Sequence, residues 1–141
     1  MIETSPSKEF ILAETTELRD ALPKGIEWAW DSHHNALLAE FSVDHEQSFL
    51  LTLAQYYPHK WDKKSIKQAA PKLGHRAKKF ADLRASQLLF STDNSGEAEI
   101  MLAWWPWGHG ATISARIFRG NQDEYVPKSG LFQKISASFK K

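Results

Sequence analysis

Six histidines are the residues best suited to acid–base or metal chemistry in this 141-residue chain, and three of them fall in two neighbouring predicted turns. His33 and His34 lie in a turn between two predicted strands, and His45 lies in the next turn. Three imidazoles on one rim are ligands that zinc can use. However, the chain has no HExxH or comparable spacing, and adjacent residues of a strand-like turn point to different sides. We therefore expect solvated turn histidines and no metal site.

His109 and the pair Glu97 and Glu99 are the other residues suited to acid–base catalysis. Two glycines flank His109, and a tight structural loop explains them as well as a catalytic loop does. The two glutamates share one face of a predicted strand, but beside a turn such residues usually face water. The chain has no GxSxG, GxxxxGK[ST] or GxGxxG motif and no cysteine. The sequence therefore favours a protein without catalytic residues or cofactor, with a histidine-based hydrolase as a lesser alternative.

The most unusual feature is the run Trp104-Trp105-Pro106-Trp107, in a chain that has six tryptophans. On a strand, Trp105 and Trp107 share one face and Trp104 points to the other. Proline cannot donate to a sheet ladder, so Pro106 indicates a strand end or an edge. Core packing is the alternative explanation for the cluster. We predict a partner- or ligand-binding surface formed by Trp104, Trp105, Trp107, His109, Trp61 and Tyr57.

A basic stretch between residues 60 and 79 follows Tyr56, Tyr57 and Trp61 closely. Basic groups with neighbouring aromatic rings can hold a nucleic-acid backbone and stack on its bases. The alternative is a helical region with a solvated lysine face. Because the net charge of the whole chain is only +1, the sequence favours the solvated face. The basic residues are Lys60, Lys63, Lys64, Lys67, Lys72, Arg76, Lys78 and Lys79.

Apolar spacing and turn residues predict the elements that must position these side chains. We expect an N-terminal arm over residues 1–25 and a single α+β domain over residues 26–141. The fold predicted is an antiparallel sheet of about six strands with helices packed against it, including a C-terminal helix. Strands are predicted at 26–30, 36–43, 48–57, 86–92, 97–105 and 111–119, with helix as the rival for 48–57, and helices at 16–21, within 63–84 and at 131–139.

Composition restricts the cellular setting as well. The first 50 residues hold ten acidic and three basic side chains, and the remainder holds seven acidic and fifteen basic ones. Opposite charges brought together in one fold can neutralise each other across a shared surface. No apolar run approaches the roughly 20 residues that span a bilayer, and the first eight residues lack the apolar core of a signal peptide. We expect a cytoplasmic protein without membrane contact.

Two segments resemble the PsbP-like superfamily. These are Leu22-Pro23-Lys24-Gly25 ahead of the strand predicted at Ile26–Trp30, and the closing stretch from Leu131 to Lys140. A central helical stretch and a β-rich run lie between them. The resemblance implies an antiparallel sheet flanked by helices and a role in binding without catalysis, since the superfamily includes photosystem extrinsic proteins, a Ran-binding adaptor and type VI secretion chaperones.

Taken together, the sequence predicts a non-enzymatic binding protein of the adaptor, chaperone or immunity type that meets a protein or peptide through its tryptophan-rich sheet surface. The first alternative is a small apolar or aromatic ligand held in a pocket between sheet and helices. Nucleic-acid binding through residues 60–79 is less favoured. A tryptophan-bearing edge also suits a homodimer.

Overall fold

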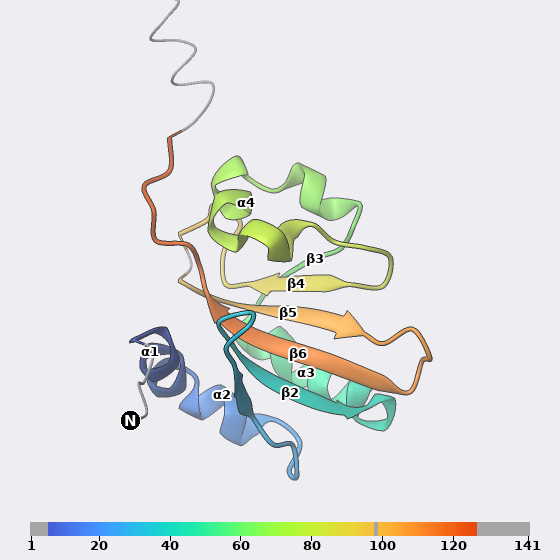
Figure 1. Ribbon diagram of the computed structural model, residues 1–141. Helices are drawn as coiled ribbons and strands as arrows, with labels where there is room; N and C mark the ends of the chain where they lie inside the picture. Colours follow the sequence, from blue (N-terminus) through green and yellow to red (C-terminus); the bar gives the residue numbers. More distant parts are fainter. Residues whose placement is uncertain (1–5, 98, 127–141) are drawn as a thin grey trace, which may run out of the picture.

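The computed structural model describes residues 6–97 and 99–126, which form a six-stranded antiparallel sheet with helices on both faces (Figure 1). The strands lie in the order β1-β2-β6-β5-β4-β3. The α+β class and the six-stranded antiparallel sheet predicted from the sequence are therefore confirmed. The strands are β1 (Ala29–Asp31), β2 (Ala36–Ser42), β3 (His59–Trp61), β4 (Leu88–Ser91), β5 (Ile100–Pro106) and β6 (Thr112–Arg119). The helices are α1 (Pro6–Glu14), α2 (Thr16–Ala21), η1 (Val43–His45), α3 (Glu46–Tyr56), η2 (Ser65–Gln68), α4 (Pro71–Ala77) and η3 (Lys78–Ala81).

Alternating side chains of the central strands divide the core into two parts, one on each face of the sheet. On the first face, α1, α2 and α3 pack on apolar side chains of β2, β5 and β6, with Trp104 and Phe49 almost fully buried. On the second face, α4 and η3 pack on a smaller set that includes Leu89, Met101 and Phe118. The two cores together fix the sheet between two helical layers of unequal size.

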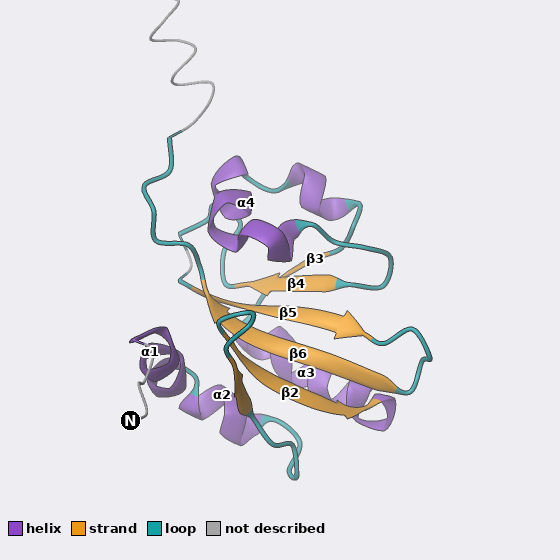
Figure 2. Ribbon diagram, in the orientation of Figure 1, coloured by secondary structure: helices purple, strands orange, loops and turns teal. Residues whose placement is uncertain are grey.

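The smaller layer leaves part of the second face uncovered. Helix α4 and its neighbours lie over the β3–β4 side of the sheet, whereas no helix of the described residues crosses the exposed side of β2 and β6 (Figure 2). Helix α3 lies behind these strands, on the first face (Figure 1). The sheet therefore offers one surface on which strand side chains point away from any helical layer.

The strand predicted at residues 48–57 is wrong, and its rival is correct: these residues form most of α3. Phe49 and Leu53 are fully buried, while Leu51 between them is 69% exposed. A strand would have placed all three on one face, whereas residues four apart share a face of a helix. The strand on this side of the sheet is instead β3, which follows Pro58 and was not predicted.

The other predicted elements match the structure more closely. The hairpin of β1 and β2, the helix at Thr16–Ala21 and the successive antiparallel strands β4, β5 and β6 are confirmed. Within residues 63–84, Pro71 starts α4, because the first helical position needs no N–H donor. The part of the predicted N-terminal arm that is described forms α1 and α2, whose Ile11, Leu18 and Leu22 are buried in the core. The predicted C-terminal helix lies outside the described residues.

Candidate functional site

The uncovered part of the second face carries a row of functional side chains from three adjacent strands. Trp105 on β5 lies directly opposite Ser114 on β6, and Ser114 lies opposite Glu40 on β2. Trp107 follows two residues after Trp105, and Arg116 follows two residues after Ser114, so both point to the same side. We call these five residues, Glu40, Trp105, Trp107, Ser114 and Arg116, the open sheet face.

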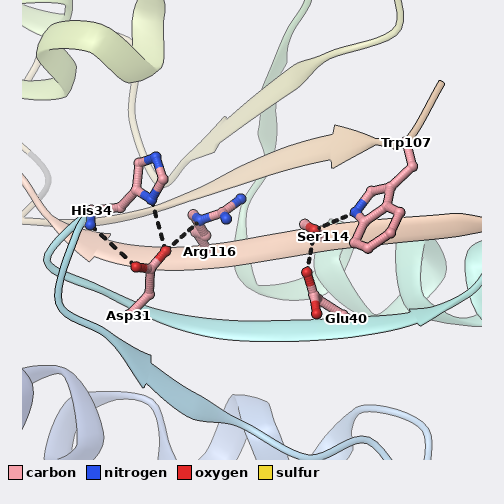
Figure 3. A network of polar contacts seen from close by, with 6 residues as sticks. All are labelled: Asp31, His34, Glu40, Trp107, Ser114 and Arg116. Atoms are coloured by element: carbon pink, nitrogen blue, oxygen red, sulfur yellow. Dashed lines mark hydrogen bonds and ion pairs between the residues drawn. The ribbon is translucent and has the colours of Figure 1, made fainter.

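Trp107 is the most exposed aromatic residue of the open sheet face, and hydrogen bonds hold both its ring and its backbone. Its side chain is 43% exposed. Its indole Nε1–H donates to Ser114 Oγ at 2.7 Å, and that hydroxyl donates to Glu40 Oε2 at 3.3 Å (Figure 3). Its backbone N–H donates to the carbonyl oxygen of Thr112 at 2.8 Å. The ring is thus presented to solvent in one fixed orientation.

Trp105 is half-buried and enclosed by other rings and a cation. The guanidinium of Arg116 lies 4.5 Å from its ring centroid, a cation–π contact. The rings of His34 and Phe80 lie 5.3 and 5.6 Å away, centroid to centroid. Trp105 therefore connects the open sheet face to the core under α4 and is less free than Trp107 to meet a partner.

Asp31, at the end of β1, joins the open sheet face to the turn before β2. Its Oδ2 accepts from Arg116 Nε at 2.9 Å and lies 2.8 Å from His34 Nδ1 (Figure 3). Burial alone would raise the pKa of this carboxyl, but the hydrogen bonds from Arg116 and His34 outweigh it and lower the pKa to about 2. Asp31 is therefore an ionised acceptor at neutral pH.

His34 itself is held neutral. Burial is the largest cause and lowers the pKa of the imidazole. The nearby charges of Arg116 and Lys79 also lower this pKa, whereas the hydrogen bond and the charge of Asp31 raise it. Because an ionised carboxylate can only accept, the imidazole proton lies on Nδ1 and the Nε2 lone pair is free to act as an acceptor. This Asp–His pair was not predicted as a pair. The three-residue spacing across a turn was its only signal in the sequence.

The structure separates the predicted site residues. Trp104 is a core residue: it is 1% exposed and its ring contacts Phe41, Phe49 and Phe90, so it is not part of the surface that holds Trp105 and Trp107. The physical reason is the alternation of the strand, which turns Trp104 toward the larger helical layer.

The three remaining predicted residues take different positions. His109 is exposed in the loop after β5, with its ring 5.4 Å from that of Trp107, and it extends the open sheet face. Trp61 lies on the edge strand β3, where its Nε1–H donates to Ser91 Oγ at 3.0 Å. Tyr57 is buried at the end of α3, and burial raises the pKa of its hydroxyl. Neither Trp61 nor Tyr57 lies on the open sheet face.

The histidines and glutamates considered for catalysis do not converge. Within residues 6–97 and 99–126, no group of three His, Asp or Glu side chains could hold a metal ion. Glu97 is paired with Lys72 and Glu99 with Arg119, so the two carboxylates serve separate ion pairs. His33 contacts His34 edge to face at 4.7 Å.

The basic stretch is divided among several elements. Lys63, Lys64 and Lys67 are exposed around η2, as a solvated face would be. Arg76 on α4 is directed inward and donates to the carbonyl oxygens of Gly96 and Asn121 at 3.1 and 2.8 Å. Lys78 and Lys79 lie beyond the end of α4, beside a cavity.

Two surface cavities accompany the open sheet face. The larger, about 310 Å³, lies on the first face and is lined by residues of α1, α2 and β5 and by Tyr56 and Tyr57. The smaller, about 240 Å³, lies between the turn at His34 and the end of α4.

Sequence reasoning missed Asp31, Glu40, Ser114 and Arg116. For Ser114 and Arg116, the available signal was polar residues alternating with the apolar residues of β6.

Fold and site together define an α+β protein with an antiparallel sheet that is covered on one face and half-covered on the other. Comparison with protein-family models, with curated proteins and with solved structures finds no match for this chain. The resemblance to the PsbP-like superfamily therefore stays a prediction. In the described part of the chain, no helix has the length and apolar character needed to cross a membrane.

Proposed function

We propose that this chain is a non-enzymatic binding protein, of the adaptor, chaperone or immunity type, that holds a segment of a partner protein against the open sheet face. The observation that carries the proposal is Trp107, whose exposed ring donates a hydrogen bond to Ser114 and whose backbone N–H is bonded to Thr112. Tryptophan is enriched among the residues that dominate protein–protein binding. A ring already fixed in position loses little conformational entropy when a partner binds.

The chemistry beside Trp107 indicates what the partner presents. Glu40 is exposed and makes one long hydrogen bond to Ser114, so its charge is available to a cation. The positive charge of Arg116 is already matched by Asp31 and by the ring of Trp105. A segment with an apolar or proline side chain over the Trp107 ring and a lysine or arginine beside Glu40 fits both features.

The edges of the sheet are less suited to a partner than its face. The edge strands β1 and β3 each have three residues. Short edge strands are one of the ways in which proteins limit strand addition. Recognition by side chains of the open sheet face is therefore favoured over extension of the sheet.

The experiment compares two variants in which an exposed apolar side chain is truncated. Tagged wild type, Trp107→Ala and Leu51→Ala are used to capture proteins from nuclease-treated lysate of the chain's own host. Leu51 is 69% exposed on α3 and serves as the matched control. Trp105 is left intact because its removal would also disturb packing against Phe80.

The proposal predicts a protein that wild type and Leu51→Ala retain and that Trp107→Ala loses. A synthetic segment of that protein, containing the basic and apolar residues, should bind at least about tenfold more weakly to Trp107→Ala, as expected for a central aromatic anchor. Equal retention by all three proteins would refute the role of the open sheet face. Self-association lost with Trp107→Ala would identify a second copy of the chain as the partner.

One observation favours a second candidate function, the binding of a small apolar or aromatic ligand. The 310 Å³ cavity lies between helices and sheet and includes Phe10, Tyr56 and Tyr57. Its size is near the lower limit of about 300 Å³ for small-molecule sites. A compound panel in a thermal-shift assay tests it: a ligand that stabilises wild type but not Phe10→Ala would support this function, and the absence of any stabilising compound would exclude it for the panel.

A further inference from the structure

The smaller cavity, on the second face, has a wall of basic and amide groups. About 240 Å³ in volume, it is bordered by His34 and Asn35 of the turn before β2, by Arg76 and Lys78 and Lys79 at the end of α4, and by Asn121 after β6. None of the described residues that line it is an aspartate or a glutamate. The cavity is therefore suited to an anion.

Most of the positive charges around this cavity, those of Arg76, Lys78 and Lys79, have no ion-pair partner among the described residues. Arg119, which also lines the cavity, is the exception, because it is paired with Glu99. Asp31 is bonded to Arg116 and to His34. Lys78 and Lys79 have exposed side chains, and the Lys79 ammonium lies over a ring face with its centroid 5.6 Å away. Their charges are thus available to a bound anion.

The end of α4 opposes an anion less than a bare helix C-terminus would. Unpaired carbonyl groups give such an end a partial negative charge. Here the carbonyl oxygen of Arg76 accepts the backbone N–H of Asn121 at 2.7 Å. The guanidinium of Arg76 is held by two further carbonyl oxygens, which fixes its positive charge beside the cavity.

His34 adds an acceptor to this basic wall. Its Nδ1 is bonded to Asp31, and Figure 3 shows the second ring nitrogen pointing away from that carboxylate. A neutral imidazole in this tautomer accepts a hydrogen bond from an O–H group at Nε2. Cations together with one acceptor match a phosphoryl group that still carries a proton, which phosphate monoesters do near their second pKa of about 6.

Two of the three non-glycine residues with positive φ in the described part of the chain line this cavity. Lys78 has φ 52° and ψ −126°, a conformation that residues other than glycine rarely adopt. Asn35, on the opposite wall, also has φ 52°, which asparagine tolerates better. Strained residues persist where the surrounding structure holds them, and they cluster at binding sites.

We propose that this cavity binds the phosphoryl group of a small phosphate monoester, with Lys78 and Lys79 supplying charge, Arg76 supplying a guanidinium held in position by carbonyl oxygens, and His34 Nε2 accepting a hydrogen bond from the phosphoryl O–H. The volume is below the range of about 300 to 1,000 Å³ that holds drug-sized ligands, so the organic part of the ester extends into solvent. This site is separate from the partner segment proposed for the open sheet face.

The test is a titration of the full chain with inorganic phosphate at pH 6 and low ionic strength, followed by NMR of the His34 ring. Sulfate is titrated in parallel, because it has the same shape without a proton to donate. Glycerol 3-phosphate and a phosphoserine peptide then distinguish a free metabolite-sized ester from a phosphorylated protein side chain. The variants are Lys78→Gly, Lys79→Ala and, as charge-matched control, Lys67→Ala, which is exposed and does not line the cavity.

The proposal predicts saturable phosphate binding that shifts the His34 signals and is weakened at least about fivefold by Lys78→Gly and by Lys79→Ala, the size expected for one charge-assisted contact. Lys67→Ala should change affinity less than about twofold, since exposed charges act weakly at a distance. Lys78→Gly removes the charge and relieves the strained conformation, so weaker binding by a more stable protein cannot be ascribed to unfolding.

Three results would overturn the inference. These are absence of saturation, equal weakening by all three lysine variants, and phosphate binding that leaves the His34 signals unmoved. If sulfate bound as tightly as phosphate, His34 would not act as a hydrogen-bond acceptor for the ligand. Trp107→Ala should leave phosphate binding unchanged, so failure of the partner-binding proposal and failure of this one can be told apart.

Discussion

Replacing Lys78 by glycine is expected to stabilise the protein, an unusual outcome for the loss of a side chain. The residue begins η3 with φ 52° and ψ −126°. A non-glycine residue in such a region costs about 1 to 3 kcal/mol, and glycine adopts it without steric cost. Glycine also makes the unfolded chain more flexible, which costs roughly 0.5 to 1 kcal/mol. Because the Lys78 side chain is exposed, its truncation removes little packing, and a net gain of about 1 kcal/mol remains.

The assay is equilibrium unfolding in urea, followed by tryptophan fluorescence and by circular dichroism. In a parallel thermal melt, a gain of about 1 kcal/mol corresponds to a rise in Tm of about 3 °C for a chain of this size. Lys79→Gly is the matched control, since Lys79 is the adjacent exposed lysine and does not have a positive φ. That variant should lose roughly 0.5 to 1 kcal/mol. If Lys78→Gly and Lys79→Gly lost stability to the same extent, Lys78 would carry no backbone strain. That result would refute the reasoning.

Other substitutions test the core and the polar groups. Trp104→Ala should cost about 3 to 5 kcal/mol in denaturant unfolding because it empties a fully buried site, and a loss below about 1 kcal/mol would show that the ring is not a core residue. Gly96→Ala should cost about 2 to 4 kcal/mol, since φ is 92° and a Cβ atom would lie 2.6 Å from the backbone nitrogen of Leu73; an unchanged Tm would contradict this close approach. Asp31 has a folded-state pKa of about 2, below its ordinary 3.8, so its contribution is present above pH 4 and is lost as pH falls toward 2. We expect the wild type to lose on the order of 1 kcal/mol more than Asp31→Asn over that interval, and parallel stability curves would contradict it.

The pattern of residues along each strand is enough to predict several features of the fold. Alternation on β5 separates Trp104 from Trp105 and Trp107, and the structure shows that separation. Turn residues between β1 and β2, and between the later strands, give the antiparallel connections. These features are local, because a period of two residues and a short turn are written in consecutive positions of the chain.

The segment at residues 48–57 shows where local pattern fails. A ten-residue segment rich in apolar and aromatic residues is compatible with a strand or a helix, and nearby sequence does not decide between them. Tertiary packing decides it, since Phe49 stacks on Phe41 at 4.4 Å between centroids and contacts Trp104 at 5.5 Å. A helix lying across the first face makes both contacts while leaving Leu51 in solvent.

The candidate sites depend still more on the tertiary structure. Asp31 and Arg116 are 85 positions apart, and Glu40 and Ser114 are 74 positions apart. The pairing of β2 with β6 places the second pair in contact, and the added pairing of β1 with β2 brings Asp31 to Arg116. The sequence by itself determined the antiparallel class and the two faces of each central strand, because these follow from neighbouring residues. The tertiary structure decided which tryptophan is buried and which polar groups meet. Both depend on the order of the strands and on the helices, which cover one face of the sheet fully and the other in part.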